Sequence, residues 1–361
     1  MKNNKFTYVI FAIGLLLLPM FAAQFGNAWV RIIDIALLYV LLALGLNVVV
    51  GYAGLLDLGY VAFYAVGSYL FGLLASGHLT STFPAIAAMF PEGLHAPIWL
   101  VIPLGAAVAG LAGVMLGAPT LRLRGDYLAI VTLGFGEIIR VFLNNLDQPV
   151  NITNGPKGIG PIDSMKLFGY DFGQKHTILG VEIPTVTNYY YLFLALVIAS
   201  VVICYRLERS RIGRAWMAIR EDEIAAKAMG INTRNMKLLA FGMGASFGGV
   251  AGVMFSTYQS FVTPEAFSLQ ESVMIVAMVV LGGIGHIPGV IVGAVLLAAL
   301  PEVLRYVAGP LQQLTDGRLD ASILRQLLIA LAMIVVMLLR PRGLWPSPEH
   351  GKAAPKPVSP Q

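Results

Sequence analysis

Apolar runs long enough to cross a membrane recur along almost the whole chain. A transmembrane helix needs about 20 mostly apolar residues. Hydrophobic residues make up 57% of the 361 positions and charged residues only 12%, whereas soluble proteins carry about 25% charged residues. The sequence therefore predicts an all-α polytopic membrane protein with about ten transmembrane helices. The expected spans are 6–23, 32–50, 59–75, 98–118, 127–143, 188–205, 236–258, the short 271–284, 287–308 and 323–339.

The basic residues indicate which loops face the cytoplasm. Lys and Arg are concentrated in cytoplasmic loops of membrane proteins. Basic groups occur at Lys2 and Lys5, at Arg122 and Arg124, within 206–237, and at Arg340 and Arg342. An even number of expected spans separates each group from the next, so all four groups and both termini are expected inside. The net charge of +5 is thereby assigned to the cytoplasmic membrane face and not to nucleic acid.

The chain is expected to form one transmembrane domain over 1–345, followed by a disordered tail over 346–361 that is rich in Pro, Lys and Ser. The first span is expected as a retained helix, with a cleaved secretory signal as the alternative. The loop 144–187 is expected outside. Its aromatic stretch over 166–172 favours a small hairpin, and the loop is either an ordered cap or a solvated linker.

Two glycine-rich segments interrupt apolar runs, one in each half of the chain. They contain Gly51, Gly54 and Asp57 in the first, and Gly282, Gly283 and Gly285 in the second. Broken helices expose backbone polar groups, which a membrane tolerates only inside protein or beside a cavity, and matched breaks point to a transport pathway. Tight turns or close helix packing remain the alternative. The glycines of 242–252 are typical of a packing face.

Few residues carry chemistry of their own. Glu137 and Arg140 are three positions apart and share a helix face, either as a polar gate or, as we favour, as a structural ion pair near the outer boundary. No residues have metal-ligand spacing, and no phosphate-binding Gly-x-x-x-x-Gly-Lys-Ser/Thr loop occurs. These absences argue against a metal site and against an ATPase or other enzyme.

The polar stretch 206–237 predicts a compact structure on the cytoplasmic side. Asp222 is placed to cap a short helix over 223–229, and Gly230 is placed to close it with a left-handed turn against which Ile231 packs. Asn232 or Thr233 then caps the next span. A stiff helix of this kind suits docking to a cytoplasmic partner, and the alternative is an amphipathic loop on lipid. The candidate docking residues are Arg220, Glu221, Asp222, Glu223, Ala225, Ala226 and Gly230, in which the two alanines permit close approach.

Residues 220–230 resemble the Glu-Ala-Ala loop of bacterial ABC-importer permeases. Ile224 stands in the place of the glutamate, Glu223 lies one position earlier, and the Ile-x-Leu-Pro ending of the pattern is absent. Segments 121–134, 151–156 and 280–285 resemble the branched-chain amino acid branch, the LivH/LivM permease family. The resemblance covers about 32–345.

The resemblance implies a subunit of an importer for Leu, Ile and Val in the bacterial inner membrane. It implies a LivH-type permease as heterodimer partner, two cytoplasmic ATPase subunits that hold ATP-Mg, and a soluble amino-acid binding protein outside. No cofactor is expected in this chain. The alternatives are a urea or amide permease of the same family and, from another class, an ion-coupled secondary carrier using Glu137 and Arg140.

Overall fold

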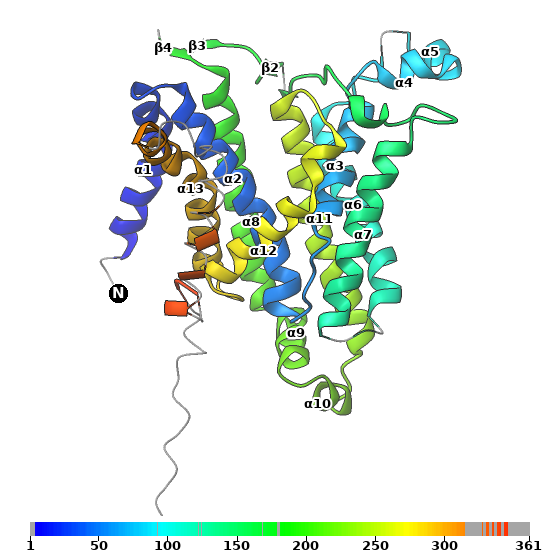
Figure 1. Ribbon diagram of the computed structural model, residues 1–361, viewed down its shortest axis with the longest axis vertical. Coiled ribbons are helices and arrows are strands. Elements are labelled where there is room, and N and C mark those ends of the chain that lie inside the picture. The colour runs from blue at the N-terminus through cyan, green and yellow to red at the C-terminus, as the bar shows by residue number, and fades with distance from the viewer. Residues whose placement is uncertain are drawn as a thin grey trace, which may run out of the picture.

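The protein is a bundle of helices, seen from the side in Figure 1. The computed structural model describes residues 4–91, 93–121, 123, 125–167, 169–178 and 181–314, with isolated positions between 327 and 345. Most of the expected tenth span 323–339 and all of the tail 346–361 lie outside the described residues. Among those described, the predicted polytopic helical membrane protein is confirmed.

Within the part of the chain that the structure describes, five helical segments are long and apolar enough to cross a membrane: Asn27–Tyr52, Ile98–Thr120, Thr185–Glu208, Thr233–Gln259 and Ile287–Leu304. The first is α2 (Asn27–Asn47) continued by a π-helical turn η1 (Val48–Tyr52), and the others are α6 (Ile98–Thr120), α8 (Thr185–Glu208), α11 (Thr233–Gln259) and the first part of α13 (Ile287–Leu314). Further helices at expected spans are α1 (Asn4–Gln24), α3 (Val61–Leu74), α7 (Asp126–Asn145) and α12 (Leu269–Gly282).

Helix α11 lies at the centre of the bundle and packs against α2, α3 and α6. Its glycines allow the backbones to touch. A Cβ at Gly249 would lie 2.4 Å from the carbonyl oxygen of Gly105 on α6, and a Cβ at Gly252 would lie 2.2 Å from that of Tyr64 on α3. Small residues at such crossings allow the close van der Waals packing that joins helices in lipid. The prediction that 242–252 forms a packing face is confirmed.

Replacing Gly249 with alanine should destabilise the bundle by about 1–3 kcal/mol, because overpacking forces the backbones apart. The control is Gly134→Ala in α7, where nothing lies within 4 Å of the added Cβ and alanine is favoured over glycine by about 1 kcal/mol. Thermal unfolding in detergent should show a lower melting temperature for Gly249→Ala only. Equal melting temperatures for the two variants would contradict the close α6–α11 contact.

Two apolar helices, α3 and α12, have only 14 residues each. A helix of that length rises about 21 Å, less than the hydrocarbon thickness of about 30 Å. Each follows a non-helical stretch, 53–60 before α3 and 260–268 before α12, interrupted there only by short turns and η3 (Pro264–Phe267). In Figure 1 the first stretch rises from the lower end of α2, whereas the second descends from the upper end of α11. The two broken spans therefore run in opposite directions.

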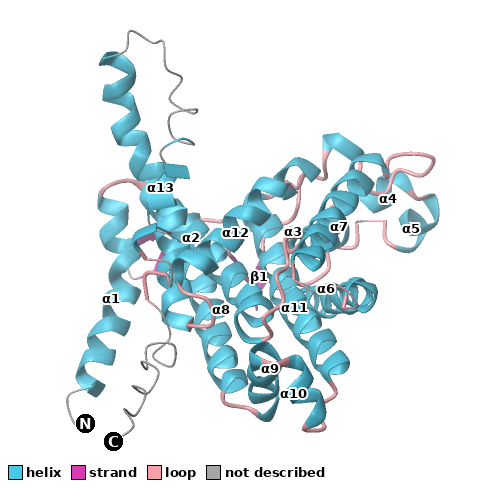
Figure 2. Ribbon diagram, turned by 60° about the horizontal axis from the view of Figure 1, so that its bottom comes forward, coloured by secondary structure: helices cyan, strands magenta, loops and turns pink. Residues whose placement is uncertain are grey.

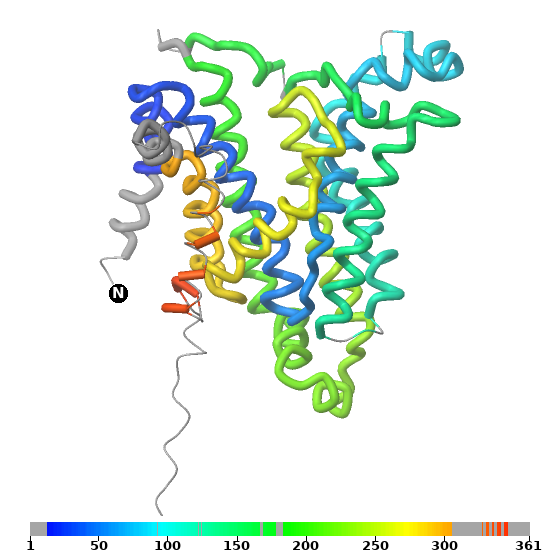
Figure 3. Tube along the Cα trace, in the orientation of Figure 1, coloured from blue at the N-terminus to red at the C-terminus, as the bar shows by residue number. Residues whose placement is uncertain are grey.

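The upper end of the bundle is covered by the loop 146–184, which the tube of Figure 3 shows crossing above α11 and α8. Two hairpins form in it, β1 (Lys166–Leu167) with β2 (Tyr170–Asp171), and β3 (His176–Ile178) with β4 (Val181–Ile183). The hairpin expected in the aromatic stretch is thus confirmed. A bridge between Ile159 and Val262 and a bond from the Asp163 N–H to the Ala75 carbonyl (2.8 Å) tie the loop down. The ordered alternative is therefore correct.

Some elements of this end were not expected. Helices α4 (His78–Thr82) and α5 (Pro84–Met89) lie in the loop between α3 and α6. A short 3-10 turn, η2 (Gly155–Lys157), follows Asn154, whose φ of 60° is left-handed. These elements have about one turn each, too short for a periodic hydrophobic pattern to reveal them.

Candidate functional site

The polar stretch after α8 folds as two short helices at the lower end of the bundle. They are α9 (Arg211–Glu221) and α10 (Glu223–Ala228), and Figure 2, turned so that this end comes forward, shows them in front of the spans. We call residues 210–232 the elbow. Helix α9 was not predicted as a separate element, although the sequence carried its signals. Ser210 caps it by accepting the Gly213 N–H at 3.1 Å.

The second helix of the elbow has the predicted local geometry. The Asp222 side chain accepts the N–H groups of Ile224 (2.8 Å) and Ala225 (3.1 Å) at the start of α10. Gly230 closes the helix with a φ of +86°. The Gly230 N–H bonds to the Lys227 carbonyl and the Ile231 N–H to the Ala226 carbonyl, both at 3.1 Å. This pair of hydrogen bonds is a Schellman motif, which makes the turn after α10 stiff.

The elbow ends at the start of α11, where Met236 and Lys237 contact residues of α9 and α10. The Asn232 side chain caps α11 by accepting the Asn235 N–H at 3.1 Å. Trp216 is fully buried, and its Nε1–H donates to the Met236 carbonyl at 2.7 Å. Lys237, which is 6% exposed, pairs with Glu223 at 2.8 Å. Because these contacts join α9, α10 and α11, the elbow is expected to move with α11 as one body.

Arg220 reaches from the elbow to the first glycine segment. Its Nη1 donates to the Gly51 carbonyl at 2.5 Å, which lies in the π-helical turn that ends α2. The Gly54 Cα, at a φ of +69°, leaves room for the arginine stem, since a Cβ there would lie 2.9 Å from Cγ of Arg220. Arg220 therefore links the last turn of α9 to the backbone of the π-helical turn that ends α2.

The two glycine segments meet beside Arg220. The Gly285 N–H donates to Oδ1 of Asn47 at 2.9 Å. A Cβ on Gly51 would lie 2.9 Å from Cα of Gly285, and a Cβ on Gly285 would lie 2.9 Å from Nη1 of Arg220. The sequence suggested a transport pathway at these segments, with tight turns or close helix packing as the alternative, and the structure places Gly51 and Gly285 in contact. It did not predict that the elbow reaches them.

The second glycine segment is a tight turn between α12 and α13, which was the alternative interpretation of residues 282–289. Gly283 and Gly285 have φ values of +121° and +83°, and the His286 N–H bonds back to the Gly283 carbonyl at 3.1 Å. A Cβ on Gly282 would lie 2.3 Å from the carbonyl oxygen of Gly289, so the two helices cross closely here. The helix break of the second half lies earlier, over 260–268.

The break over 53–60 keeps its backbone polar groups bonded by side chains from other helices. The Leu58 N–H donates to Oγ1 of Thr132 on α7 at 3.0 Å, and the Leu58 carbonyl accepts from Oγ of Ser272 on α12 at 2.5 Å. Asp57, 1% exposed, accepts the Gly59 N–H at 2.9 Å. Non-helical backbone at membrane depth is tolerated when protein satisfies it in this way.

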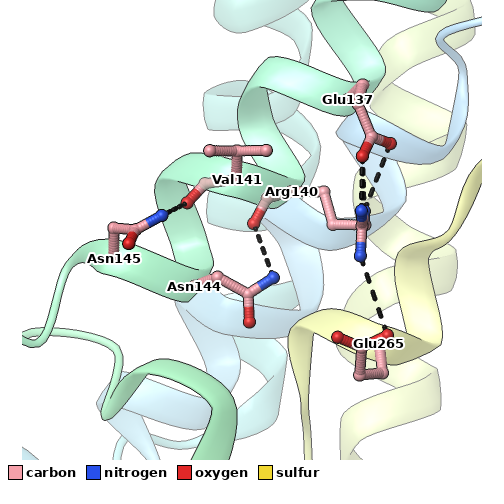
Figure 4. A network of polar contacts seen from close by, with 6 residues as sticks. All are labelled: Glu137, Arg140, Val141, Asn144, Asn145 and Glu265. Carbon is pink, nitrogen blue, oxygen red and sulfur yellow. Dashed lines mark hydrogen bonds and ion pairs between the residues drawn. The ribbon is translucent and has the colours of Figure 1, made fainter.

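Glu137 and Arg140 lie in an ion pair on α7, drawn in Figure 4. Nε of Arg140 donates to both carboxylate oxygens of Glu137, at 3.0 and 3.2 Å, and Nη2 adds a further short contact. Glu265 in η3 lies 3.7 Å from Nη1 of the same arginine. The side chains of Glu137 and Arg140 are 41% and 25% exposed. Through its contact with Glu265, Arg140 therefore connects α7 to the break that precedes α12.

The exposed face of α10 differs from the one expected. Ala226 is 4% exposed and packs within this chain, so it is not available for close approach by a partner. Ala225 and Glu221 are exposed. The large apolar side chains that point outward are Ile224, 72% exposed, and Met229, 83% exposed. An apolar pair held outward by a capped helix is suited to contact another protein.

Comparison with known proteins shows the family to which the chain is similar. The profile of the family described as "Branched-chain amino acid transport system / permease component" matches residues 29–338. The high-affinity branched-chain amino acid transport system permease protein LivM of Escherichia coli is 39% identical over 350 residues, covering 93% of this chain and 75% of that protein. The LivH permease protein of the same system name and organism is 27% identical over 323 residues, covering 87% of this chain and 93% of its own length.

A LivM permease protein from Salmonella typhimurium is 40% identical over 329 residues, covering 88% of this chain and 70% of that protein. No solved structure matches significantly.

Proposed function

Because this chain belongs to the family of branched-chain amino acid transport permease components, we propose that it imports leucine, isoleucine and valine as one membrane subunit of an ABC transporter. The chain is a multi-pass membrane protein and a transport permease component. The observation that carries the proposal is the family match over residues 29–338. The bond from Arg220 in the elbow to the Gly51 carbonyl supplies a physical connection between a docking surface and the spans.

The partners follow from the same family. A LivH-type permease is the proposed second membrane subunit, since this chain is similar to both LivM and LivH proteins. Two ATPase subunits would hold ATP-Mg, because the sequence carries no phosphate-binding loop. A soluble amino-acid binding protein would deliver substrate to the upper end. We place the complex in a bacterial inner membrane with the elbow and both termini in the cytoplasm.

The proposed mechanism transmits motion through the elbow. Closure of the ATPase pair pushes on α10, whose caps at Asp222 and Gly230 keep it from bending. The buried Trp216 and the Lys237–Glu223 pair transmit the displacement of α10 to α11. Arg220 carries it into the π-helical turn of α2 and, through the contact of Gly51 with Gly285, into the turn between α12 and α13. This mechanism requires no ATP-binding site in this chain.

The docking face gives a direct prediction. Met229→Glu should prevent the ATPase subunits from co-purifying, because a carboxylate placed in an apolar contact between proteins is desolvated without a partner. The control is Met89→Glu, which changes a similarly exposed methionine (76%) in α5 at the opposite end. Both variants should insert in the membrane at normal levels. Retention of the ATPases by Met229→Glu would remove α10 from the interface.

Transport itself is tested with the reconstituted complex in proteoliposomes. ATP-driven uptake of radiolabelled leucine should require this subunit, whereas uptake of urea should be absent with or without it. Uptake of urea in place of leucine would overturn the proposed substrate class. Transport of leucine without any ATPase subunit would overturn the importer assignment and favour a secondary carrier.

A further inference from the structure

A cleft of about 260 Å³ opens between the elbow and the first glycine segment. Its walls come from four places: residues 53–56 of the break, the start of α7, the end of α9 with the start of α10, and Lys237 at the start of α11. Ligand pockets start at roughly 300 Å³ for drug-sized molecules. A cleft of this size therefore suits one small molecule, of the size of an amino acid.

The described charged residues of the cleft balance in number. Arg220 and Lys237 supply two positive charges, and Glu223 and Asp126 supply two negative charges. Lys237 is 6% exposed, and its partner Glu223 has a side chain that is 30% exposed. A buried charge stays stable only while it is paired. A ligand with one positive and one negative group offers an opposite charge to each kind of described charged side chain in the cleft.

The rest of the lining is aliphatic. Leu55, Leu56, Leu123, Leu128 and Ile219 face the cleft together with the backbone of Gly54. Leu55 and Ile219 are buried, at 7% and 4% exposure, and Leu56 is 36% exposed at the mouth. Such a surface favours a branched aliphatic side chain, since burial of apolar area contributes about 25 cal/mol per Å².

We propose that this cleft holds the transported amino acid on the elbow side of the protein, as a zwitterion with an aliphatic side chain. Its carboxylate lies toward Arg220 and Lys237, and its ammonium lies toward Glu223 and Asp126. The proposal rests on the proposed function and adds a site at which substrate lies before it leaves. Because Arg220, Glu223 and Lys237 belong to the elbow and α11, whereas Asp126 lies on α7, movement of the elbow changes the distance between its charged groups and Asp126 and releases the ligand.

The test is protection of a cysteine at the mouth of the cleft. In the assembled complex, Cys204→Ala removes the buried native thiol, and Leu56→Cys introduces a reactive one. A soluble thiol reagent is applied from the elbow side without nucleotide. A site that must release its ligand binds weakly, and we expect a Kd of about 1 mM. At ~10 mM leucine the site is then about nine-tenths occupied. Modification of the cysteine should therefore slow about tenfold. Valine should protect similarly, while lysine and glutamate should not.

Controls distinguish leucine bound in the cleft from leucine bound elsewhere and from a bound lipid headgroup. The variant Arg211→Cys, at an exposed position of α9 outside the cleft, should react at the same rate with and without leucine. Glu223→Gln in the Leu56→Cys protein should abolish protection by leucine, because the ammonium loses its carboxylate. Phosphoethanolamine tests for a lipid headgroup, and protection by it but not by leucine would overturn the proposal. Failure of Leu56→Cys to react at all would show a covered cleft and also overturn it.

A second position keeps the test independent of one variant. Leu123→Cys probes a second lining residue if Leu56→Cys does not assemble. Uptake of leucine by each cysteine complex is measured in parallel. Normal ATP-driven uptake without protection at either position would refute the cleft site and leave the importer standing, whereas absent uptake by the unmodified complex would refute the proposed function.

Discussion

Arg220→Ala should leave the complex assembled and hydrolysing ATP while leucine uptake falls about tenfold to a hundredfold. The substitution removes the charged donor to the Gly51 carbonyl, and hydrogen bonds to charged groups contribute about 1.5–3 kcal/mol. Every 1.4 kcal/mol is about a tenfold change. ATP hydrolysis and uptake are measured on the same proteoliposomes, so that the number of leucines moved per ATP gives the coupling directly.

The matched control is Arg214→Ala on the same helix. Arg214 is exposed and bonds to the Arg209 carbonyl at 3.1 Å, away from both glycine segments. It should transport at close to the normal ratio, since it removes the same charge from α9 without touching the break. A similar loss of coupling in the two variants would mean that the charge of the elbow matters and that the contact with Gly51 does not.

Gly285→Ala should cause the second large loss of transport. Two effects combine, because a φ of +83° is strained for alanine and because the new Cβ would lie 2.9 Å from Nη1 of Arg220 and 3.3 Å from the Gly51 carbonyl oxygen. Strained backbone of this kind costs about 1–3 kcal/mol, and overpacking adds about 1–3 kcal/mol. Melting temperature and leucine uptake should both fall.

Gly169→Ala isolates the strain from the crowding. Gly169 has nearly the same φ, +85°, in the hairpin turn at the upper end, and nothing lies within 4 Å of an added Cβ. This variant should lose some stability and keep its coupling of uptake to ATP hydrolysis. The difference between the two variants then reports the contact of the glycine segments with Arg220, and the absence of any difference would contradict that contact.

Local signals in the sequence predicted the local structure well. The roles of Asp222, Gly230 and Asn232 as caps depend only on residues two to five positions away, and all three are confirmed. The spans were placed by length and hydropathy, which are also local properties. The short eighth span 271–284 corresponds to the half-length helix α12.

Contacts between distant segments could not be predicted in this way. Arg220 and Gly51 are 169 positions apart, and no periodicity links them. The burial of Ala226 depends on the direction in which the chain folds back after a one-turn helix, which alanine does not signal. Pro264 is a sequence signal for the break before α12. The glycines of 282–289 are a stronger signal for an interruption, but they mark the turn that follows α12.

The segment 53–60 has a consequence for how the protein changes shape. Helices α3, α6 and α11 touch backbone to backbone through glycines, so they resist sliding past one another. By contrast, Leu58 is fixed by two side chains, those of Thr132 and Ser272, and exchanging such bonds disturbs no helix. We therefore expect displacement during a transport cycle to be concentrated in this segment, which lies between Thr132 on α7 and Ser272 on α12.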